Sequence, residues 1–273
     1  MHILSNKINN LVEAEIAANE LECDTLIYVT EKDTFCGSGK KGIWSIGIPN
    51  NLVRIMNAII YEESNKRKVA LWSKDKVINR IILKEMNKTQ KYPIFVIEDE
   101  FLCHSTSIEN FIDILKDNKI KSLKVLLSEG KKIKTIRTVL NEPEESIECV
   151  DFCLQRSISS EIVVASRQID NIFNKNYIEY YPGVRMYMYS QKADKLQNKV
   201  IDGLHDFRVK NYIDLDNIDY IILPNKKSYE CCIKYINKKI KEKIVILSIE
   251  DKITPEEYIE QANNIVNKKF RKY

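Results

Sequence analysis

The densest group of residues that could do chemistry lies at positions 98–107, where the sequence reads Glu-Asp-Glu-Phe-Leu-Cys-His-Ser-Thr-Ser. Adjacent carboxylates such as Glu98 and Asp99 are costly unless they bind a cation, a sugar hydroxyl or a base. A turn rich in serine and threonine that leads into a helix suits a phosphate, here at Ser105, Thr106 and Ser107. These residues predict a site for a phosphate-bearing sugar compound. The alternative is a solvated loop in which Ser105 or Thr106 caps the next helix.

Three histidines are present, and histidine is the side chain whose charge changes most readily near neutral pH. His104 follows the acidic pair and is predicted to act as a general base or a phosphate contact. His205 stands between two aspartates in the stretch 202–208 and is predicted to contact a ligand from the second half of the chain. For His205 a surface cluster of charges is the alternative, and His2 is expected to be structural or exposed.

The order of features around the acidic pair resembles the diphosphate-ribose loop of type I phosphoribosyltransferases. In both, an apolar run (here residues 93–97) is followed by two acidic residues, a short loop, threonine and a helix. The resemblance implies that Glu98 and Asp99 contact ribose hydroxyls and that the loop near Ser105 holds a 5′-phosphate. The loop glycine of that family is absent, and Cys103 and His104 stand near its place.

A broader pattern is similar to bacterial sialyltransferase-type glycosyltransferases with two Rossmann-like halves (GT-B). It consists of an opening strand, a long first helix, a glycine-containing loop and an acidic strand end near residue 98. That resemblance implies a nucleotide-sugar donor. The acidic pair is followed by Glu100 where that family has glycine, and the chain has no His-Pro motif.

Six apolar runs end in serine, and in an open α/β sheet such positions lie at the carboxyl edge, where ligands bind. A serine there can cap the next helix, and the same helix N-terminus can hold a phosphate or a carboxylate. Two of these serines are followed by a cation, Ser73 by Lys74 and Ser166 by Arg167. We therefore predict that Ser73, Lys74 and Arg167 contact an anion, with ordinary capping as the alternative for each serine.

Two further clusters favour structural interpretations. Four of the seven glycines lie between residues 37 and 47, beside two lysines, but the spacing of the Walker motif is not met, which favours a hairpin or lid loop. Cys149 and Cys153 have no nearby histidine, which argues against a zinc site. No cofactor is required by the pattern, although carboxylates at 98–100 are compatible with Mg²⁺.

The elements that must position these residues alternate between short β-branched runs and segments of helical period. The runs are typical of strands buried on both faces, and the alternation is typical of βαβ units. We therefore predict an α/β fold with Rossmann-like, mainly parallel open sheets. An acidic break with a proline near residue 143 places the boundary between two such halves, 1–145 and 146–273. The expected strands are residues 2–4, 25–29, 43–48, 68–72, 93–97, 123–127, 161–165, 184–189, 219–223 and 244–247.

Composition sets limits on the partners. The chain has 273 residues, 44% of them hydrophobic and 30% charged, which is an ordinary globular composition. A net charge of +4 does not call for a nucleic-acid partner. No apolar stretch is long enough for a membrane helix, although the basic tail at 268–272 is compatible with a peripheral membrane contact. Seven cysteines without a signal peptide predict a cytoplasmic protein with reduced thiols. The oligomeric state is left open.

Three function classes are compatible with these residues. The leading hypothesis is a transferase that moves a sugar from a phosphate-activated donor, either a nucleotide sugar or phosphoribosyl diphosphate. The alternative is a non-catalytic Rossmann-like module that binds a nucleotide or a protein. A metal-dependent hydrolase would need a second set of carboxylates, which the sequence does not show at matching spacing.

Overall fold

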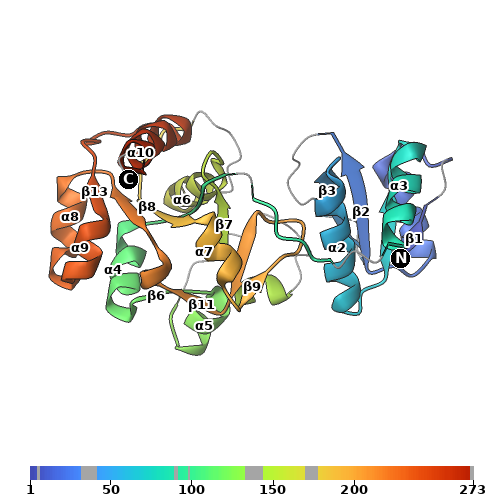
Figure 1. The fold of residues 1–273 in the computed structure, drawn as a ribbon, viewed down its shortest axis with the longest axis horizontal. Helices are drawn as coiled ribbons and strands as arrows, with labels where there is room; N and C mark the ends of the chain where they lie inside the picture. Colours follow the sequence, from blue (N-terminus) through green and yellow to red (C-terminus); the bar gives the residue numbers. More distant parts are fainter. Residues whose placement is uncertain are drawn as a thin grey trace. The chain divides into compact units, whose positions relative to one another are not determined.

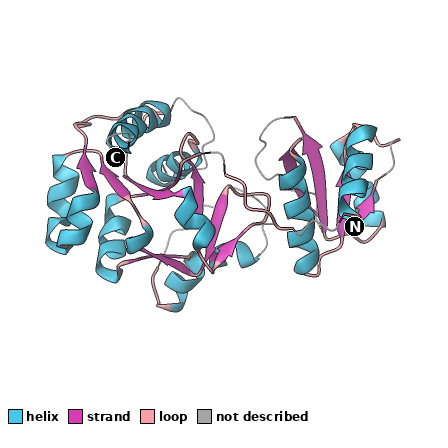
Figure 2. Ribbon diagram, viewed as in Figure 1, coloured by secondary structure: helices cyan, strands magenta, loops and turns pink. Residues whose placement is uncertain are grey.

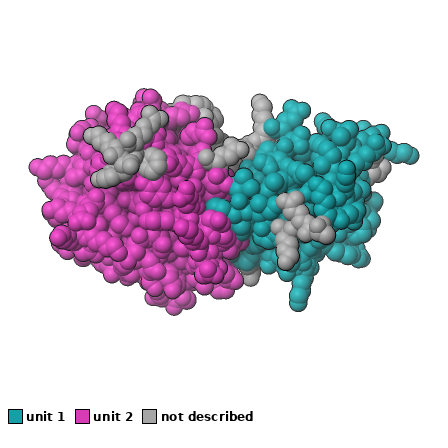
Figure 3. Space-filling view, in the orientation of Figure 1, with its two compact units in different colours: residues 1–96, 138–146, 201–205 teal, residues 97–137, 147–200, 206–273 magenta. Residues whose placement is uncertain are grey.

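The computed structural model describes residues 1–4, 7–31, 42–88, 92–97, 99–132, 144–169 and 178–270. The chain divides into two compact units, which Figure 3 shows in different colours. Unit 1 comprises Met1–Val96, Thr138–Ser146 and Ile201–His205, and unit 2 comprises the remaining residues. The sequence placed one boundary at 145/146, whereas the chain passes between the units at several points, the first of them after Val96.

Unit 1 is built on a four-stranded sheet in the order β1-β4-β2-β3, in which every pair of neighbours is parallel. The first helix packs on one face of this sheet, and the second and third helices pack on the other. The predicted α/β class and the predicted parallel sheet are therefore found in unit 1. Its elements are β1 (His2–Ile3), α1 (Leu11–Glu20), β2 (Thr25–Thr30), β3 (Trp44–Pro49), α2 (Leu52–Ser64), β4 (Val69–Trp72) and α3 (Lys76–Met86).

The helices of unit 1 begin where short polar side chains can satisfy free backbone N–H groups. Asn10 accepts from the N–H of Glu13, Asn51 from that of Arg54 and Asp75 from that of Val77. Each cap directly precedes an apolar stripe that packs on the sheet, so local sequence and core packing agree on where each helix starts.

A short segment from late in the chain completes unit 1. Gly203 has a φ of +70°, and a Cβ added there would lie 2.2 Å from the carbonyl oxygen of Arg54 and 2.6 Å from the nitrogen of Ala58. The Arg54 side chain donates to the carbonyls of Gly203 and Leu204 at 3.1 and 2.7 Å. Only glycine therefore fits this approach of the 201–205 segment to α2.

Unit 2 is built on a seven-stranded mixed sheet in the order β13-β12-β8-β5-β7-β10-β9. Only the β12–β13 pair is parallel, and the other neighbours run antiparallel. The prediction of a mainly parallel sheet is therefore wrong for unit 2. Central antiparallel strands that helices cover on both faces have the same apolar pattern as parallel strands, so composition could not separate the two. The strands are β5 (Phe101–Thr106), β7 (Cys149–Leu154), β8 (Val184–Tyr189), β9 (Lys199–Val200), β10 (Phe207–Lys210), β12 (Tyr220–Leu223) and β13 (Ile244–Ile246).

The helices of unit 2 surround this sheet, as Figures 1 and 2 show. A second, two-stranded sheet pairs β6 with β11. The elements are α4 (Ile108–Asp117), β6 (Lys119–Lys121), α5 (Leu123–Ser128), η1 (Glu144–Glu148), α6 (Ser159–Ile169), α7 (Ser190–Lys195), β11 (Tyr212–Asp214), η2 (Leu215–Asn217), α8 (Lys226–Cys232), η3 (Ile233–Tyr235), α9 (Lys238–Lys243) and α10 (Pro255–Phe270).

One face of the large sheet carries an unusual mixture of aromatic and charged residues. Successive strand residues point to opposite faces, so Cys103 and Ser105 of β5 share a face with Tyr187 and Arg185, their direct partners on β8. Helices α6 and α10 cover this face, which forms the core of unit 2. The opposite face carries Leu102, His104 and Thr106.

Three expected strands are not strands. Residues 93–97 carry no strand, and residues 123–127 and 161–165 lie in helices α5 and α6. The stretch 98–107, expected to be a polar loop, contains β5 at the middle of the sheet. Short apolar runs do not distinguish a strand from a buried helix. The final helix begins at a local sequence signal: Thr254 and Glu257 exchange hydrogen bonds as a capping box before α10.

The described residues contain no helix that is both long enough and apolar enough to cross a membrane.

We expect Gly203→Ala to destabilise unit 1 well beyond the roughly 1–2 kcal/mol that a left-handed backbone costs an ordinary residue, because its Cβ would overlap the backbone of α2. Both tryptophans, Trp44 and Trp72, lie in unit 1, so their fluorescence during urea unfolding reports this unit. The matched control is Gly42→Ala, which also has a positive φ (+96°) but whose Cβ would meet only Asn19 at 3.9 Å. Equal losses of unfolding free energy in the two variants would show that the backbone of α2 moves and relieves the clash at Gly203.

Candidate functional site

The predicted site residues are divided between the two units. Ser73, Lys74 and His205 lie in unit 1, and Glu98 lies outside the described residues. The other predicted residues lie in unit 2: Asp99, His104, Ser105, Thr106, Ser107 and Arg167.

The Asp99 carboxylate is buried and paired with Arg156, which lies in the turn between β7 and α6. Nη2 of Arg156 donates to Oδ1 of Asp99 at 2.7 Å, and the Arg156 backbone N–H donates to Oδ2 at 3.4 Å. The Arg156 side chain is nevertheless 80% exposed. A third charged group lies at the end of β7, because Asp206 accepts from the N–H of Leu154 at 3.0 Å. The start of β5, the end of β7 and the start of β10 thus bring an arginine and two carboxylates to one edge of the sheet.

His104 lies further along β5, on the face opposite Ser105. Its Nδ1 is 2.8 Å from the carbonyl oxygen of Asp151, and its ring lies against that of Phe152 with centroids 5.6 Å apart. A carbonyl can only accept, so Nδ1 carries the proton and Nε2 of the neutral ring is an acceptor. No described residue hydrogen-bonds to Nε2. The ring is thus fixed at one nitrogen and available to a ligand at the other.

The pKa of His104 is lowered, chiefly because partial burial disfavours the charged ring, and the positive charge of Arg167 acts in the same direction. The hydrogen bond to the Asp151 carbonyl and the charges of Asp151 and Glu161 oppose this shift only in part. His104 is therefore neutral at about pH 7, the form that can accept a proton.

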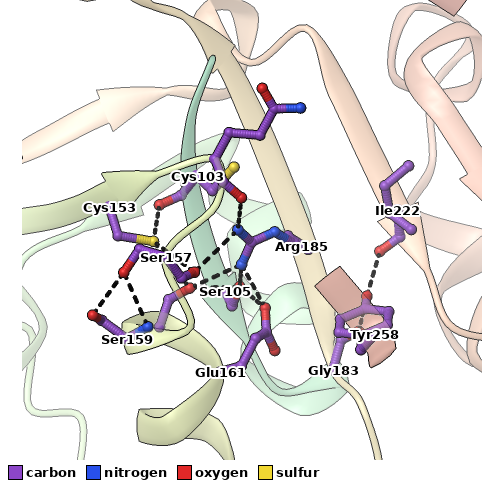
Figure 4. Close-up of polar contacts among 12 residues, drawn as sticks. Cys103, Ser105, Cys153, Ser157, Ser159, Glu161, Gly183, Arg185, Ile222 and Tyr258 are labelled. Atoms are coloured by element: carbon purple, nitrogen blue, oxygen red, sulfur yellow. Dashed lines mark hydrogen bonds and ion pairs between the residues drawn. The ribbon is translucent and has the colours of Figure 1, made fainter. Parts of the chain in front are cut away.

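Ser105 belongs to a buried polar network, shown in Figure 4, that is centred on Arg185 of β8. Arg185 and Glu161 of α6 are both fully buried, and their ion pair measures 2.8 Å. The Ser105 hydroxyl donates to Glu161 and lies 3.3 Å from Nη1 of Arg185. Nη1 also donates to the hydroxyl of Ser160 at 3.1 Å. The Ser105 hydroxyl therefore makes its hydrogen bonds inside unit 2. This geometry does not favour its predicted role as an exposed phosphate contact or a helix cap.

The other two nitrogens of the Arg185 guanidinium donate to backbone carbonyls and to a tyrosine hydroxyl. Nη2 donates to the carbonyls of Gln155 at 2.9 Å and Ser157 at 3.5 Å, and Nε donates to the Tyr187 hydroxyl at 3.1 Å. Glu161 accepts at its second oxygen from the Tyr180 hydroxyl at 2.6 Å. Burial and the Glu161 charge raise the pKa of Tyr180, so its phenol stays protonated and donates. A buried ion pair is tolerated only with such complete hydrogen bonding.

The remaining predicted residues have simpler environments. Ser107 is the N-cap of α4 and accepts from the N–H of Asn110, while Thr106 is buried at the end of β5. Ser73 follows β4 and accepts from the N–H of Asp75. Lys74 is exposed.

Arg167 and His205 also differ from their predicted surroundings. Arg167 lies in the last turn of α6 rather than after a strand, so the basis on which it was predicted is wrong, yet its charge acts on His104. His205 is paired with Asp202 at 2.8 Å within unit 1. Of the predicted residues, Arg167 thus lies close enough to His104 for its charge to lower the pKa of that ring. Asp99 pairs with Arg156, which was not predicted.

The described residues offer no metal site, because no group of three or more His, Cys, Asp or Glu side chains is placed to hold an ion. The glycine loop at residues 37–41 lies outside the described residues, as does Glu98. Cys153 points to the buried network, donating to the hydroxyl of Ser160 at 3.3 Å. Burial raises the pKa of the neighbouring Cys103 thiol, which keeps it protonated.

Three residues that shape the site were not predicted, Arg156, Glu161 and Arg185, whereas Asp206 is one of the two aspartates noted beside His205. A signal existed for Arg185, because a lone arginine within the apolar run 184–189 must find a partner if the strand is buried. Three serines before the helical period at Ile162 also mark a helix N-terminus at Ser159. The pairing of Asp99 with Arg156 has no local signal, since 57 positions separate them.

Comparisons with known proteins give little further information. No family model matches the chain, and the search of curated proteins finds no match. A structure of Thermus sp. 2.9 DarT in complex with carba-NAD+ is 14% identical over 56% of this chain and 97% of that chain, with a TM-score of 0.36. A second, of the same protein in complex with ADP-ribosylated ssDNA, is 13% identical over 59% and 96%, with a TM-score of 0.34. Likeness at this level supports no inference about this chain.

We expect the His104 ring to titrate below the pH at which histidine does in the unfolded chain, because folding partly buries it beside Phe152. As pH falls, the unfolded chain then takes up a proton that the folded chain does not, so this group lowers the free energy of unfolding. NMR titration of the imidazole, assigned by its loss in His104→Gln, gives the folded pKa, and the same titration in concentrated urea gives the reference. A folded pKa at or above the reference would show that His104 is solvated or paired with a carboxylate.

Proposed function

We propose that this chain is a transferase that moves a sugar from a nucleotide-sized, phosphate-activated donor, which binds unit 2 at the edge formed by Asp99 and Arg156. The observation that carries the proposal is the pairing of a buried carboxylate with an exposed guanidinium. Asp99 holds Arg156 in one arrangement, and the exposed fork of the guanidinium suits the oxygens of a phosphate. An arginine held in advance loses less conformational freedom when it binds an anion.

The position of His104 favours an elongated donor. Residues advance by roughly 3.3 Å along an extended chain, so position 104 in β5 and position 99, which precedes this strand, are separated by about 16 Å. A ligand that contacts Arg156 and His104 together must therefore extend over that length. A nucleotide sugar or a dinucleotide is long enough, whereas a simple sugar phosphate is not. Within the two donor classes expected from the sequence, this favours the nucleotide sugar over phosphoribosyl diphosphate.

In the step we propose, Arg156 holds the phosphates and the donor sugar lies toward His104. An oxygen or nitrogen of the acceptor attacks the anomeric carbon, and the bond from that carbon to the leaving group breaks. The electron pair of the broken bond departs with the leaving group, and Nε2 of His104 takes the proton of the acceptor. The lowered pKa of His104 keeps Nε2 unprotonated for this role at about pH 7.

One observation favours the alternative, a module that binds a nucleotide without catalysis. The buried charged residues of unit 2, Arg185 on β8 and Glu161 on α6, bond to each other and to buried neighbours, so they stabilise the unit without facing a substrate. In that case Arg156 still binds phosphate, but His104 has no acceptor to deprotonate.

We expect a nucleotide-sized donor to raise the midpoint of thermal unfolding of the wild type by mass action and to lose this effect in Arg156→Met. The panel comprises nucleotides, nucleotide sugars, phosphoribosyl diphosphate and NAD+, the last as a dinucleotide long enough to reach both Arg156 and His104. A higher unfolding midpoint with nucleotide sugars or NAD+, but not with phosphoribosyl diphosphate, supports a donor long enough to reach both Arg156 and His104.

Matched controls separate binding at this edge from general effects. Arg80→Met removes an exposed arginine from α3 in unit 1 and should leave the shift intact. His104→Gln should abolish turnover of the donor, measured by release of its leaving group, and should weaken binding less than Arg156→Met does. Binding without turnover in the wild type supports the module, and the absence of any shift contradicts both functions.

A further inference from the structure

We propose that Arg185 is a positioning residue, which holds the turn that carries Arg156 in fixed register with the strand that carries His104. This inference concerns the site of the proposed function and rests on it for the role of Arg156 and His104. The geometry that it uses is independent of any ligand.

The guanidinium of Arg185 contacts the turn on both sides of Arg156. Arg156 is flanked by Gln155 and Ser157, and the carbonyls of both flanking residues accept from Nη2 of Arg185. A second donor, Nδ2 of Asn263 on α10, also reaches the Gln155 carbonyl at 3.1 Å. The backbone on both sides of the exposed guanidinium is thus held from the core beneath it, as Figure 4 shows for Ser157.

The same guanidinium contacts β5 next to His104. His104 and Thr106 flank Ser105, whose hydroxyl contacts Arg185 and Glu161. Ser105 is also the direct partner of Arg185 in the β5–β8 ladder. One guanidinium therefore contacts the neighbours of both residues that the proposed function uses, Arg156 and His104.

Glu161 has a supporting part in this arrangement. It pairs with Nη1 of Arg185 and is itself held by Tyr180, so the guanidinium has one orientation. Nη2 is then directed to the turn rather than to the carboxylate. A lysine at position 185 could pair with Glu161 but has no planar fork with which to hold two carbonyls at once.

The test is Arg185→Lys, examined first without ligand by amide hydrogen exchange at Arg156 and Ser157. In the wild type these amides donate to Oδ2 of Asp99 and to the carbonyl of Leu154. We expect their exchange to quicken about tenfold or more in the variant, as loss of a buried hydrogen bond implies. Donor affinity, where the wild type binds a donor, should fall by a similar factor.

The matched control is Tyr258→Phe, which removes a buried hydroxyl of the same core. That hydroxyl donates to the carbonyl of Gly183 at 2.9 Å and does not contact the turn. The Tyr258→Phe substitution should lower thermal stability while leaving hydrogen exchange at the Arg156 and Ser157 amides unchanged. If Arg185→Lys does not fold, Asn263→Ala, which removes the second donor to Gln155, takes its place.

Each outcome supports or overturns the positioning role of Arg185. Unchanged exchange at both amides in Arg185→Lys, or equally fast exchange in Tyr258→Phe, overturns the positioning role. Fast exchange in Arg185→Lys alone supports it. If the wild type binds none of the donors, the proposed function fails while the exchange result still stands, so the two failures are distinguishable.

Discussion

The buried ion pair between Arg185 and Glu161 is the interaction on which the arrangement of unit 2 depends. Neither side chain reaches solvent, and two charges in a protein interior are expensive unless both are fully hydrogen-bonded. The groups that meet this requirement are a serine on β5, Ser160 at the start of α6, a tyrosine beside the carboxylate and two backbone carbonyls of the turn. Strand β8, strand β5, helix α6 and the turn before it are therefore held in a single register.

The pair also explains why residues of different character alternate on β5. Ser105 faces the charged core, and His104 faces the other side, where its ring meets Phe152 and its Nε2 has no described partner. A strand at the middle of a sheet gives a side chain a more fixed position than a loop does. The candidate site thus combines a firmly held strand, bearing His104, with a turn, bearing Arg156, that the same guanidinium anchors.

Unit 1 and the last helix could be predicted from sequence because their signals are local. Apolar β-branched runs, capping residues and helical stripes place β2, β3, β4 and α3, and the capping box at Thr254 places the start of α10. Unit 2 could not be predicted in the same way. Strand β5 reads as a polar loop because His104, Ser105 and Thr106 are polar, and only the buried partners on β8 and α6 make such residues compatible with a central strand. The sequence predicts Asp99 and His104 as site residues, but the partner of Asp99 comes from tertiary structure.

The most direct measurement is a double-mutant cycle of Arg185→Met and Glu161→Leu, followed by hydrogen exchange of the slowest β5 and β8 amides and of the turn amides of Arg156 and Ser157. Each single variant leaves a buried charge without its partner and should lose about 3–5 kcal/mol in the slowest amides, whereas the double variant should recover most of this loss. We predict that the turn amides of the double variant still exchange fast, because no donor then reaches the Gln155 and Ser157 carbonyls from position 185. Slow turn amides in the double variant would contradict the positioning role of Arg185, since the ion pair would then be dispensable for the site.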